Sequence, residues 1–373
     1  MTRLRAELLA LAEALVNYES PSSAKAHCDL LADHIAERFA PLGTVERYAN
    51  PTGGDHLRVS VAAPAAPPAA QPGLILCHYD TVWPVGTLAD RPLRVVGDTA
   101  YGPGLYDMKI SIAMAELALR TLRETGQPLA RPLTLLFTAD EEIGSPTSRA
   151  LIEQTAQACA HVLVLEPPVE RTGALKTARK GCGAFTLDLR GRAAHAGVEP
   201  EQGRSAVTEL AHQILALNAL ADPTCGTTVN VGVVKGGTGR NVVPAEAQLE
   251  LDVRVWTQAE AARMEAACHA LTPVTPEVQL VVRGGFNRPP MESSPASAAL
   301  FARVQAIGAT LGLTLAEGRT GGGSDGNFTA ALGLPTLDGL GAPGQGAHAT
   351  HEQVDLPGAL TRLALLTALL ERL

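Results

Sequence analysis

Three apolar segments of strand length, separated by helical patterns, limit the fold of this 373-residue chain more than any other feature. The apolar segments span residues 73–77, 133–138 and 161–165, and helical patterns cover 110–123 and 147–157. Strands that alternate with helices form a parallel sheet whose two faces the helices cover. The sequence therefore predicts an α/β fold with a mainly parallel sheet between helices.

Ionisable residues follow each of these predicted strands within two positions. His78 follows the first strand, the run 140–142 (Asp-Glu-Glu) follows the second, and Glu166 follows the third. The carboxyl ends of parallel strands meet at one sheet edge, which is where open α/β sheets bind ligands. Asp80 lies two residues after His78 and can orient its ring through the second ring nitrogen.

The acidic run at 140–142 has two interpretations. Three successive carboxylates repel each other, so they form either a solvated loop or a site where a cation neutralises them. His78 and Glu166 are expected at the same edge of the sheet, which favours the cation. Imidazole together with carboxylates suits zinc or a similar first-row divalent ion.

Two glycine-containing loops supply further candidates. Residues 101–107 form a predicted tight loop that presents Asp107 before a helix, either as an N-cap or as a ligand. A longer loop over 339–352 carries His348 and His351, and spacing alone does not decide which one is a ligand.

A third glycine-rich stretch covers residues 321–326. It lacks the Lys-Ser/Thr pair of a phosphate-binding loop, and no strand closely precedes it. We expect Gly322 to form part of the wall of a substrate pocket, where the absence of a side chain allows close backbone approach.

The middle of the chain has a different pattern, in the order β-α-β-β-α-β. This order predicts a small ferredoxin-like domain inserted into the α/β domain. The expected strands are 184–189, 227–234, 243–256 and 278–283, and the expected helices are 206–220 and 258–271. We therefore expect a first catalytic segment at 1–178, the insertion at 179–287 and a second catalytic segment at 288–373.

Composition excludes several classes of partner. The formal net charge of −8 argues against binding to nucleic acid or to an anionic membrane. Charges interrupt the helical pattern over 4–17, which is therefore not a signal peptide, and no run is apolar enough to span a membrane. The six cysteines lack a C-x-x-C pair and are expected to be reduced thiols in a cytoplasmic protein.

Nine short motifs occur in one order along nearly the whole chain. Together they resemble the M20 family of di-zinc metallopeptidases, most closely its glutamate carboxypeptidase branch. The motifs are His78-Tyr-Asp80-Thr-Val, Tyr101-Gly-Pro-Gly-x-x-Asp107-x-Lys, Asp140-Glu-Glu142-x-Gly-Ser, Glu166-Pro, Gly191-Arg-Ala-Ala-His195-Ala-Gly, Asn241-Val-Val-Pro, Asp252-Val-Arg254, Arg319-Thr-Gly-Gly-Gly-Ser-Asp325 and His348-x-x-x-Glu352.

The resemblance implies a zinc exopeptidase-like fold and two Zn²⁺ per chain, with another divalent first-row metal as an alternative. It also implies a cis peptide bond after the bridging aspartate, and it favours His348 over His351 as a ligand. The implied roles are Asp107 as the bridge, His78 and Glu166 on one metal, Glu142 and His348 on the other, Glu141 as general base, and Asp80 as the partner of His78.

The resemblance further implies a homodimer formed through the inserted domain, in which His195 reaches the catalytic site of the partner subunit and stabilises the oxyanion. Asn241, Arg254 and Arg288 are candidates for holding a substrate carboxylate. The Arg288-Pro289 pair matches the glutamate carboxypeptidase branch, although its flanking residues differ.

The implied reaction is hydrolysis of the amide bond to a C-terminal amino acid, for which glutamate is a candidate, in a small peptide or an N-acyl amino acid. Glu rather than Asp at position 166 resembles the carboxypeptidase and deacylase branches, so an N-acyl-amino-acid or acetylornithine-type deacylase is the alternative. A dinucleotide-binding protein is disfavoured because His78-Tyr-Asp80 follows the first strand where G-x-G-x-x-G would stand. An inactive scaffold would lack a ligand or the base, and the sequence retains them all.

Overall fold

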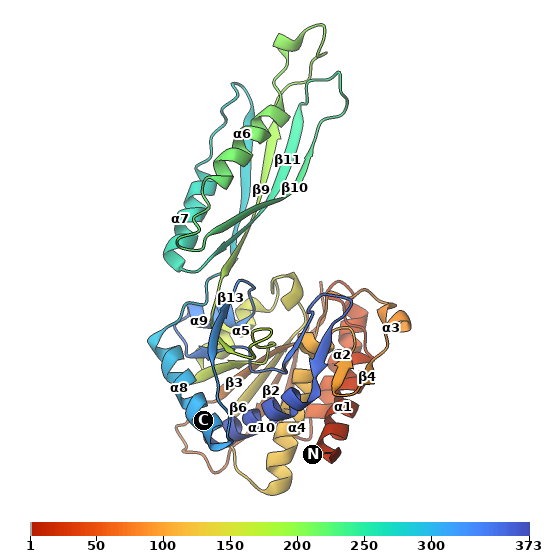
Figure 1. Cartoon of the computed structure of the whole chain (residues 1–373), viewed down its shortest axis with the longest axis vertical. Helices are drawn as coiled ribbons and strands as arrows, with labels where there is room; N and C mark the ends of the chain where they lie inside the picture. Colours follow the sequence, from red (N-terminus) through yellow and green to blue (C-terminus); the bar gives the residue numbers. More distant parts are fainter. Residues whose placement is uncertain (1) are drawn as a thin grey trace. The chain divides into compact units, whose positions relative to one another are not determined.

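The computed structural model describes residues 2–373, and its chain divides into two compact units (Figure 1). The first unit comprises Met1–Thr177, Ser293–Thr320 and Ser324–Leu373. The second unit comprises Ala178–Glu292 together with Gly321–Gly323. A central part of the chain thus forms a unit of its own, while the segments on either side of it fold together.

A six-stranded sheet in the order β1-β2-β6-β3-β7-β14 forms the centre of the first unit. Strands β6, β3, β7 and β14 run parallel, whereas β1 and β2 are antiparallel additions at one edge. The prediction of a mainly parallel sheet is therefore confirmed. The strands are β1 (Thr44–Tyr48), β2 (His56–Val61), β3 (Gly73–His78), β6 (Leu133–Thr138), β7 (His161–Val164) and β14 (Thr336–Leu337).

Alternate residues of the central strands enter two different hydrophobic cores. Ile75 and Leu135 belong to the larger core, together with apolar residues of α1, α2, α4, α8 and α10. Leu74 and Leu136 belong to the smaller core, which includes residues of α5 and α9. Helices therefore cover both faces of the sheet, as the strand–helix alternation predicts. The helices are α1 (Thr2–Val16), α2 (Lys25–Phe39), α3 (Thr87–Asp90), α4 (Ile110–Thr125), α5 (Arg149–Gln157), α8 (Pro295–Thr310), α9 (Gly326–Ala331) and α10 (Leu356–Arg372).

Short elements that the sequence patterns do not reveal complete the first unit. Strands β15, β16, β5 and β4 form a small antiparallel sheet, and β13 pairs with β8. The segment Leu105–Lys109 precedes α4, and its backbone departs from helical angles at Asp107 and Met108. These strands are only two to five residues long and lack the continuous apolar runs of β3, β6 and β7: β4 (Arg94–Val96), β5 (Thr99–Tyr101), β8 (Leu175–Arg179), β13 (Glu317–Thr320), β15 (Gly344–Gln345) and β16 (Gln353–Asp355).

The second unit has the predicted β-α-β-β-α-β order. Its sheet is antiparallel throughout, in the order β10-β11-β9-β12. Helices α6 and α7 pack on one face, where Leu187, Leu249 and Met264 belong to a common core. The elements are β9 (Gly181–Arg190), α6 (Ala206–Asn218), β10 (Thr228–Gly236), β11 (Glu246–Val255), α7 (Gln258–His269) and β12 (Gln279–Arg288).

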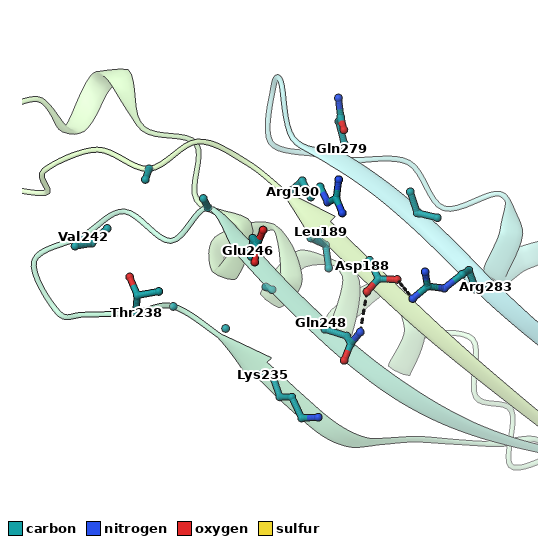
Figure 2. A pocket seen from close by; sticks show the side chains of 16 residues that line it. Asp188, Leu189, Arg190, Lys235, Thr238, Val242, Glu246, Gln248, Gln279 and Arg283 are labelled. Carbon is teal, nitrogen blue, oxygen red and sulfur yellow. Dashed lines mark hydrogen bonds and ion pairs between the residues drawn. The ribbon is translucent and has the colours of Figure 1, made fainter.

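The other face of this sheet carries polar side chains around a groove of about 720 Å³ (Figure 2). Asp188 lies in the groove, where it pairs with Arg283 and accepts a hydrogen bond from Gln248 at 2.7 Å. The groove is lined by residues of the second unit alone.

The six cysteines are free thiols. Within residues 2–373, no helix combines the length and the apolar character needed to cross a membrane.

Candidate metal centre

The carboxyl ends of three neighbouring strands place histidine and carboxylate side chains together in the first unit. His78 is the last residue of β3, and its side chain is 1% exposed. Its Nε2 lies 3.1 Å from Oδ1 of Asp107 and 3.4 Å from Oε1 of Glu166. One potential ligand atom from each of these three residues lies within 4.8 Å of the others. This arrangement could hold one metal ion.

A second group shares Asp107 with the first. Nε2 of His348 lies 3.0 Å from Oε2 of Glu142 and 3.5 Å from Oδ2 of Asp107. Asp107, Glu142 and His348 also present ligand atoms within 4.8 Å of one another. His351 belongs to neither group among the described residues, so the geometry selects the histidine that spacing leaves open.

Asp107 joins the two groups because its two oxygens face different histidines: Oδ1 faces His78 and Oδ2 faces His348. The Asp107–Met108 peptide bond is cis, as the resemblance implies. Burial opposes ionisation of Asp107, but His348 and His78 together hold its pKa well below the usual range.

The same contacts raise the pKa values of the two histidines. Asp107 and Glu142 raise the pKa of His348 to about 10. Burial disfavours a charge on His78, but hydrogen bonds to Asp107, Asp80 and Glu166 raise its pKa well above the usual value. Burial raises the pKa of Glu142. The carboxylates thus favour positive charge at this edge of the sheet.

These residues fit a pair of divalent cations. Each group offers one imidazole nitrogen and carboxylate oxygens, a donor set typical of zinc and similar first-row ions. Nε2 of each histidine faces carboxylate oxygens, so a cation could bind between the same partners. Asp107 would be the shared ligand of both ions.

Asp80 connects the first group to the loop that follows β6. Its Oδ1 lies 3.5 Å from Nδ1 of His78, and its backbone oxygen lies 3.0 Å from the same nitrogen. Its two carboxylate oxygens also accept the backbone N–H groups of Glu141 at 3.2 Å and Glu142 at 3.1 Å. The Asp80 side chain is fully buried. Asp80 therefore orients both His78 and the residue expected to act as base.

The three acids of the predicted run have separate environments. Asp140 is buried and accepts four hydrogen bonds, from the backbone and hydroxyl groups of Thr147 and Ser148. These bonds hold the loop in place without an added cation. Glu142 belongs to the second ligand group, and Glu141 begins the short helix Glu141–Ile143 at a half-buried position.

Glu352 is a buried residue of this region for which the sequence predicts no role. It is 1% exposed and accepts N–H groups from Trp83, Gly104, Tyr106 and Asp107. Burial raises its pKa to about 7. The signal available in the sequence was its place four residues after His348.

The remaining predicted residues lie in the second unit, in two places. Cys182 on β9 has Arg254 of β11 and Arg288 of β12 as its cross-strand partners on either side. Nη1 of Arg254 lies 2.6 Å from Sγ of Cys182, and Arg254 also pairs with Asp252 at 2.8 Å. Gly322 is near this end of the sheet, because Arg179 donates to its carbonyl oxygen at 3.1 Å.

His195 and Asn241 lie at the opposite end of the same sheet, beyond the start of β11. The backbone N–H of Ala196 donates to the carbonyl of Asn241 at 2.9 Å. Nδ1 of His195 accepts the N–H of Gly197 at 3.1 Å, so a neutral ring carries its proton on Nε2. Strand β11 has ten residues and is about 30 Å long, which separates this pair from Arg254.

Comparison with known proteins decides the family. The sequence profile described as peptidase family M20/M25/M40 matches residues 74–372. The chain belongs to this family. It is therefore a hydrolase of peptide or amide bonds, and the resemblance seen in the nine motifs is confirmed.

Two curated relatives extend over much of this M20 chain. Carboxypeptidase G2 of Pseudomonas sp. (strain RS-16) is 34% identical over 304 residues, which cover 80% of this chain and 72% of the relative. Succinyl-diaminopimelate desuccinylase of Acidovorax ebreus is 29% identical and covers 93% of both chains. Among solved structures, aminopeptidase PepT of Bacillus cereus has the same fold, with a TM-score of 0.79, 23% identity and 98% coverage of both chains.

Proposed function

We propose that this M20 hydrolase is a zinc-dependent exopeptidase that removes a C-terminal amino acid, with glutamate as a candidate, from a small peptide or an N-acylated substrate. The observation that carries the proposal is the position of Asp107, whose two oxygens face His78 and His348 in two separate ligand groups. Two bound divalent cations would polarise the scissile carbonyl and lower the pKa of the attacking water.

Glu141 is the proposed general base. It follows Asp140 on the loop that also carries Glu142, and its backbone N–H is fixed by Asp80. Its negative charge is close enough to contribute to the raised pKa of His78. Glu141 would take one proton from water as the oxygen attacks the carbonyl carbon, and would give that proton to the amine nitrogen as the C–N bond breaks.

The two arginines beside Cys182 are the proposed anchors for the carboxylate of the departing amino acid. A guanidinium group binds a carboxylate through two parallel hydrogen bonds, and Arg254 and Arg288 approach one end of the sheet from both sides of β9. The relation to carboxypeptidase G2 favours a C-terminal amino acid as the leaving group.

His195 is the proposed oxyanion donor, acting from a partner subunit. Within one second unit, the length of β11 keeps it away from Arg254 and Arg288. One substrate could therefore meet all three residues only if two copies of the chain contribute, which supports a homodimer.

A deacylase that releases an acyl group from the nitrogen of an amino acid is the second candidate. Its support is the relation to succinyl-diaminopimelate desuccinylase, which extends over 93% of both chains. Both candidates break an amide bond with the same centre, so they differ in which side of that bond is recognised.

A substrate panel separates the two candidates. In one series the acyl group is fixed and the C-terminal residue varies; in the other, the amino acid is fixed and the acyl group varies from acetyl to succinyl to pteroyl-type aromatic groups. An exopeptidase should discriminate strongly in the first series, and a deacylase in the second. Each assay is repeated with a chelator and after restoring Zn²⁺. Turnover that survives complete removal of metal would contradict both candidates.

A further inference from the structure

We infer that Glu352 is a positioning residue that holds Asp107 and His348 at the separation required for the second metal. This inference rests on the proposed function, because it concerns the same pair of ligand groups. The carboxylate of Glu352 is buried and joins two loops that lie far apart in the sequence, one carrying Asp107 and the other carrying His348.

The first contact is with the loop that carries Asp107. Oε1 of Glu352 accepts the backbone N–H groups of Tyr106 at 2.9 Å and Asp107 at 3.2 Å. Oε2 accepts the backbone N–H of Gly104 at 2.8 Å. Three N–H groups of one turn therefore point at a single carboxylate, a geometry that backbone turns use to bind anions.

The shape of this turn depends on Gly104. Its φ of +68° is in the left-handed region, and a Cβ atom there would lie 2.4 Å from Cγ2 of Thr81. A glycine is needed to bring the three N–H groups together, and the carboxylate of Glu352 satisfies them within the protein. Nε1 of Trp83 completes the set by donating to Oε2 at 2.8 Å.

The second contact is with the turn that carries His348. The backbone N–H of Glu352 donates to the carbonyl oxygen of Ala349 at 2.9 Å, and the N–H of Ala349 donates to Gly346 at 2.9 Å. His348 itself has a φ of +62°, and its side chain is 51% exposed. Because half of this side chain is exposed, we expect the turn that ends at Glu352 to contribute to its placement.

The two ligand groups should differ in their dependence on Glu352. His78 ends a central strand and Glu166 follows another, so the buried sheet positions both. His348 instead lies on a loop that is joined to the segment carrying Asp107 by Glu352 and by the short pairing of β16 with β5. Loss of this carboxylate should disturb the His348 group much more than the His78 group.

Glu352→Gln tests the inference. The amide keeps the size of the side chain but presents an NH₂ group to N–H donors, so some of the hydrogen bonds from the Asp107 turn are lost. Zn²⁺ binding to metal-free protein is measured by calorimetry, and bound metal is counted after gel filtration. We expect one site to stay within about threefold of the wild type and the other to weaken by 10- to 100-fold.

Glu170→Gln is the matched control. Glu170 also contacts the His348 loop, because its Oε1 accepts the N–H of Gly346 at 3.1 Å, but it is exposed. It should leave both affinities within about threefold of the wild type. If Glu352→Gln does not yield folded protein, Glu352→Asp keeps the charge and should show an intermediate loss at one site.

Two results would overturn the inference. One is wild-type affinity at both sites in a folded Glu352 variant. The other is equal weakening of both sites together with a matching fall in the melting temperature of the metal-free protein, which would mark a general structural role. Failure of the proposed function is a separate outcome, because it would appear in the wild type as fewer than two bound ions.

Discussion

The carboxylate of Asp80 accepts the backbone N–H of Glu141 at a distance of 3.2 Å. This hydrogen bond links the residue that orients His78 to the proposed general base. A single fully buried residue therefore contacts both a candidate metal ligand and the proposed general base. Substitutions at the two residues should have different effects.

Glu141→Gln should remove the base while leaving the ligand groups intact. Glu141 belongs to neither group of ligand atoms, so metal content should stay at the wild-type level. We expect kcat to fall by about 10²–10⁴-fold, the range typical of general acid–base catalysis. Steady-state kinetics with metal analysis of the same samples measures both quantities. Wild-type kcat in a fully loaded variant would remove Glu141 from the mechanism.

Asp80→Asn should lower metal affinity as well as kcat. The amide cannot accept every hydrogen bond that the carboxylate takes from Ser22, Glu141 and Glu142. Loss of a partner behind a ligating histidine typically weakens metal binding by about 10–100-fold. Ser22→Ala removes only one donor and should weaken binding far less. Competition with a chelator of known affinity gives both values, and equal losses in the two variants would argue against this role.

His161 should make the stability of the metal-free protein depend on pH. Burial, with the positive charges of Arg131 and Arg303, lowers the pKa of His161 to about 3, against about 6.5 when unfolded. Between these values the unfolded chain binds the proton and the folded chain does not. The free energy of unfolding should therefore fall as the pH drops below about 6.5, by up to about 1.4 kcal/mol per pH unit.

The variant His161→Gln should reduce this pH dependence. Urea unfolding at several pH values between 7.5 and 4, with chelator in every buffer, gives the slope for each protein. The exposed His212 provides the control, and His212→Gln should leave the slope at its wild-type value. A wild-type slope in His161→Gln would show that other groups cause the acid sensitivity.

Arg254→Met should weaken binding only of substrates that end in a free carboxylate. A lost charge-assisted hydrogen bond of about 1.5–3 kcal/mol corresponds to a rise in KM of roughly 10- to 150-fold. The matching C-terminal amide substrates should show little change in KM. Arg283→Met removes a guanidinium from the polar face of the same sheet and serves as the control. An equal rise for acid and amide substrates would exclude direct recognition of the carboxylate.

The central elements were predictable because their sequence patterns have a single interpretation. The apolar runs that became β3, β6 and β7 could only be buried strands, and their ends led directly to His78, Glu142 and Glu166. The order of elements in the second unit was predictable for the same reason. Strands of two or three residues, such as β15 and β4, carry too little pattern to be recognised.

The acidic run at 140–142 is only partly explained by its sequence. Three successive carboxylates favour a bound cation. The carboxylate of Asp140, however, accepts hydrogen bonds from Thr147 and Ser148. Only one of the three acids enters a ligand group. At the end of a strand, successive side chains point in different directions. The residues that they contact therefore depend on segments far away in the sequence.

The sheet, the inserted unit and the residue types available for a metal centre are predictable from the sequence, because the local hydrophobic period and the residues at strand ends encode them. Contacts between distant segments place His348 rather than His351 beside Asp107, as the family resemblance implies. They also join two distant loops through Glu352 and put His195 and Arg254 at opposite ends of one sheet. Those relationships depend on contacts between segments far apart in the chain, and no local pattern of residues records such contacts.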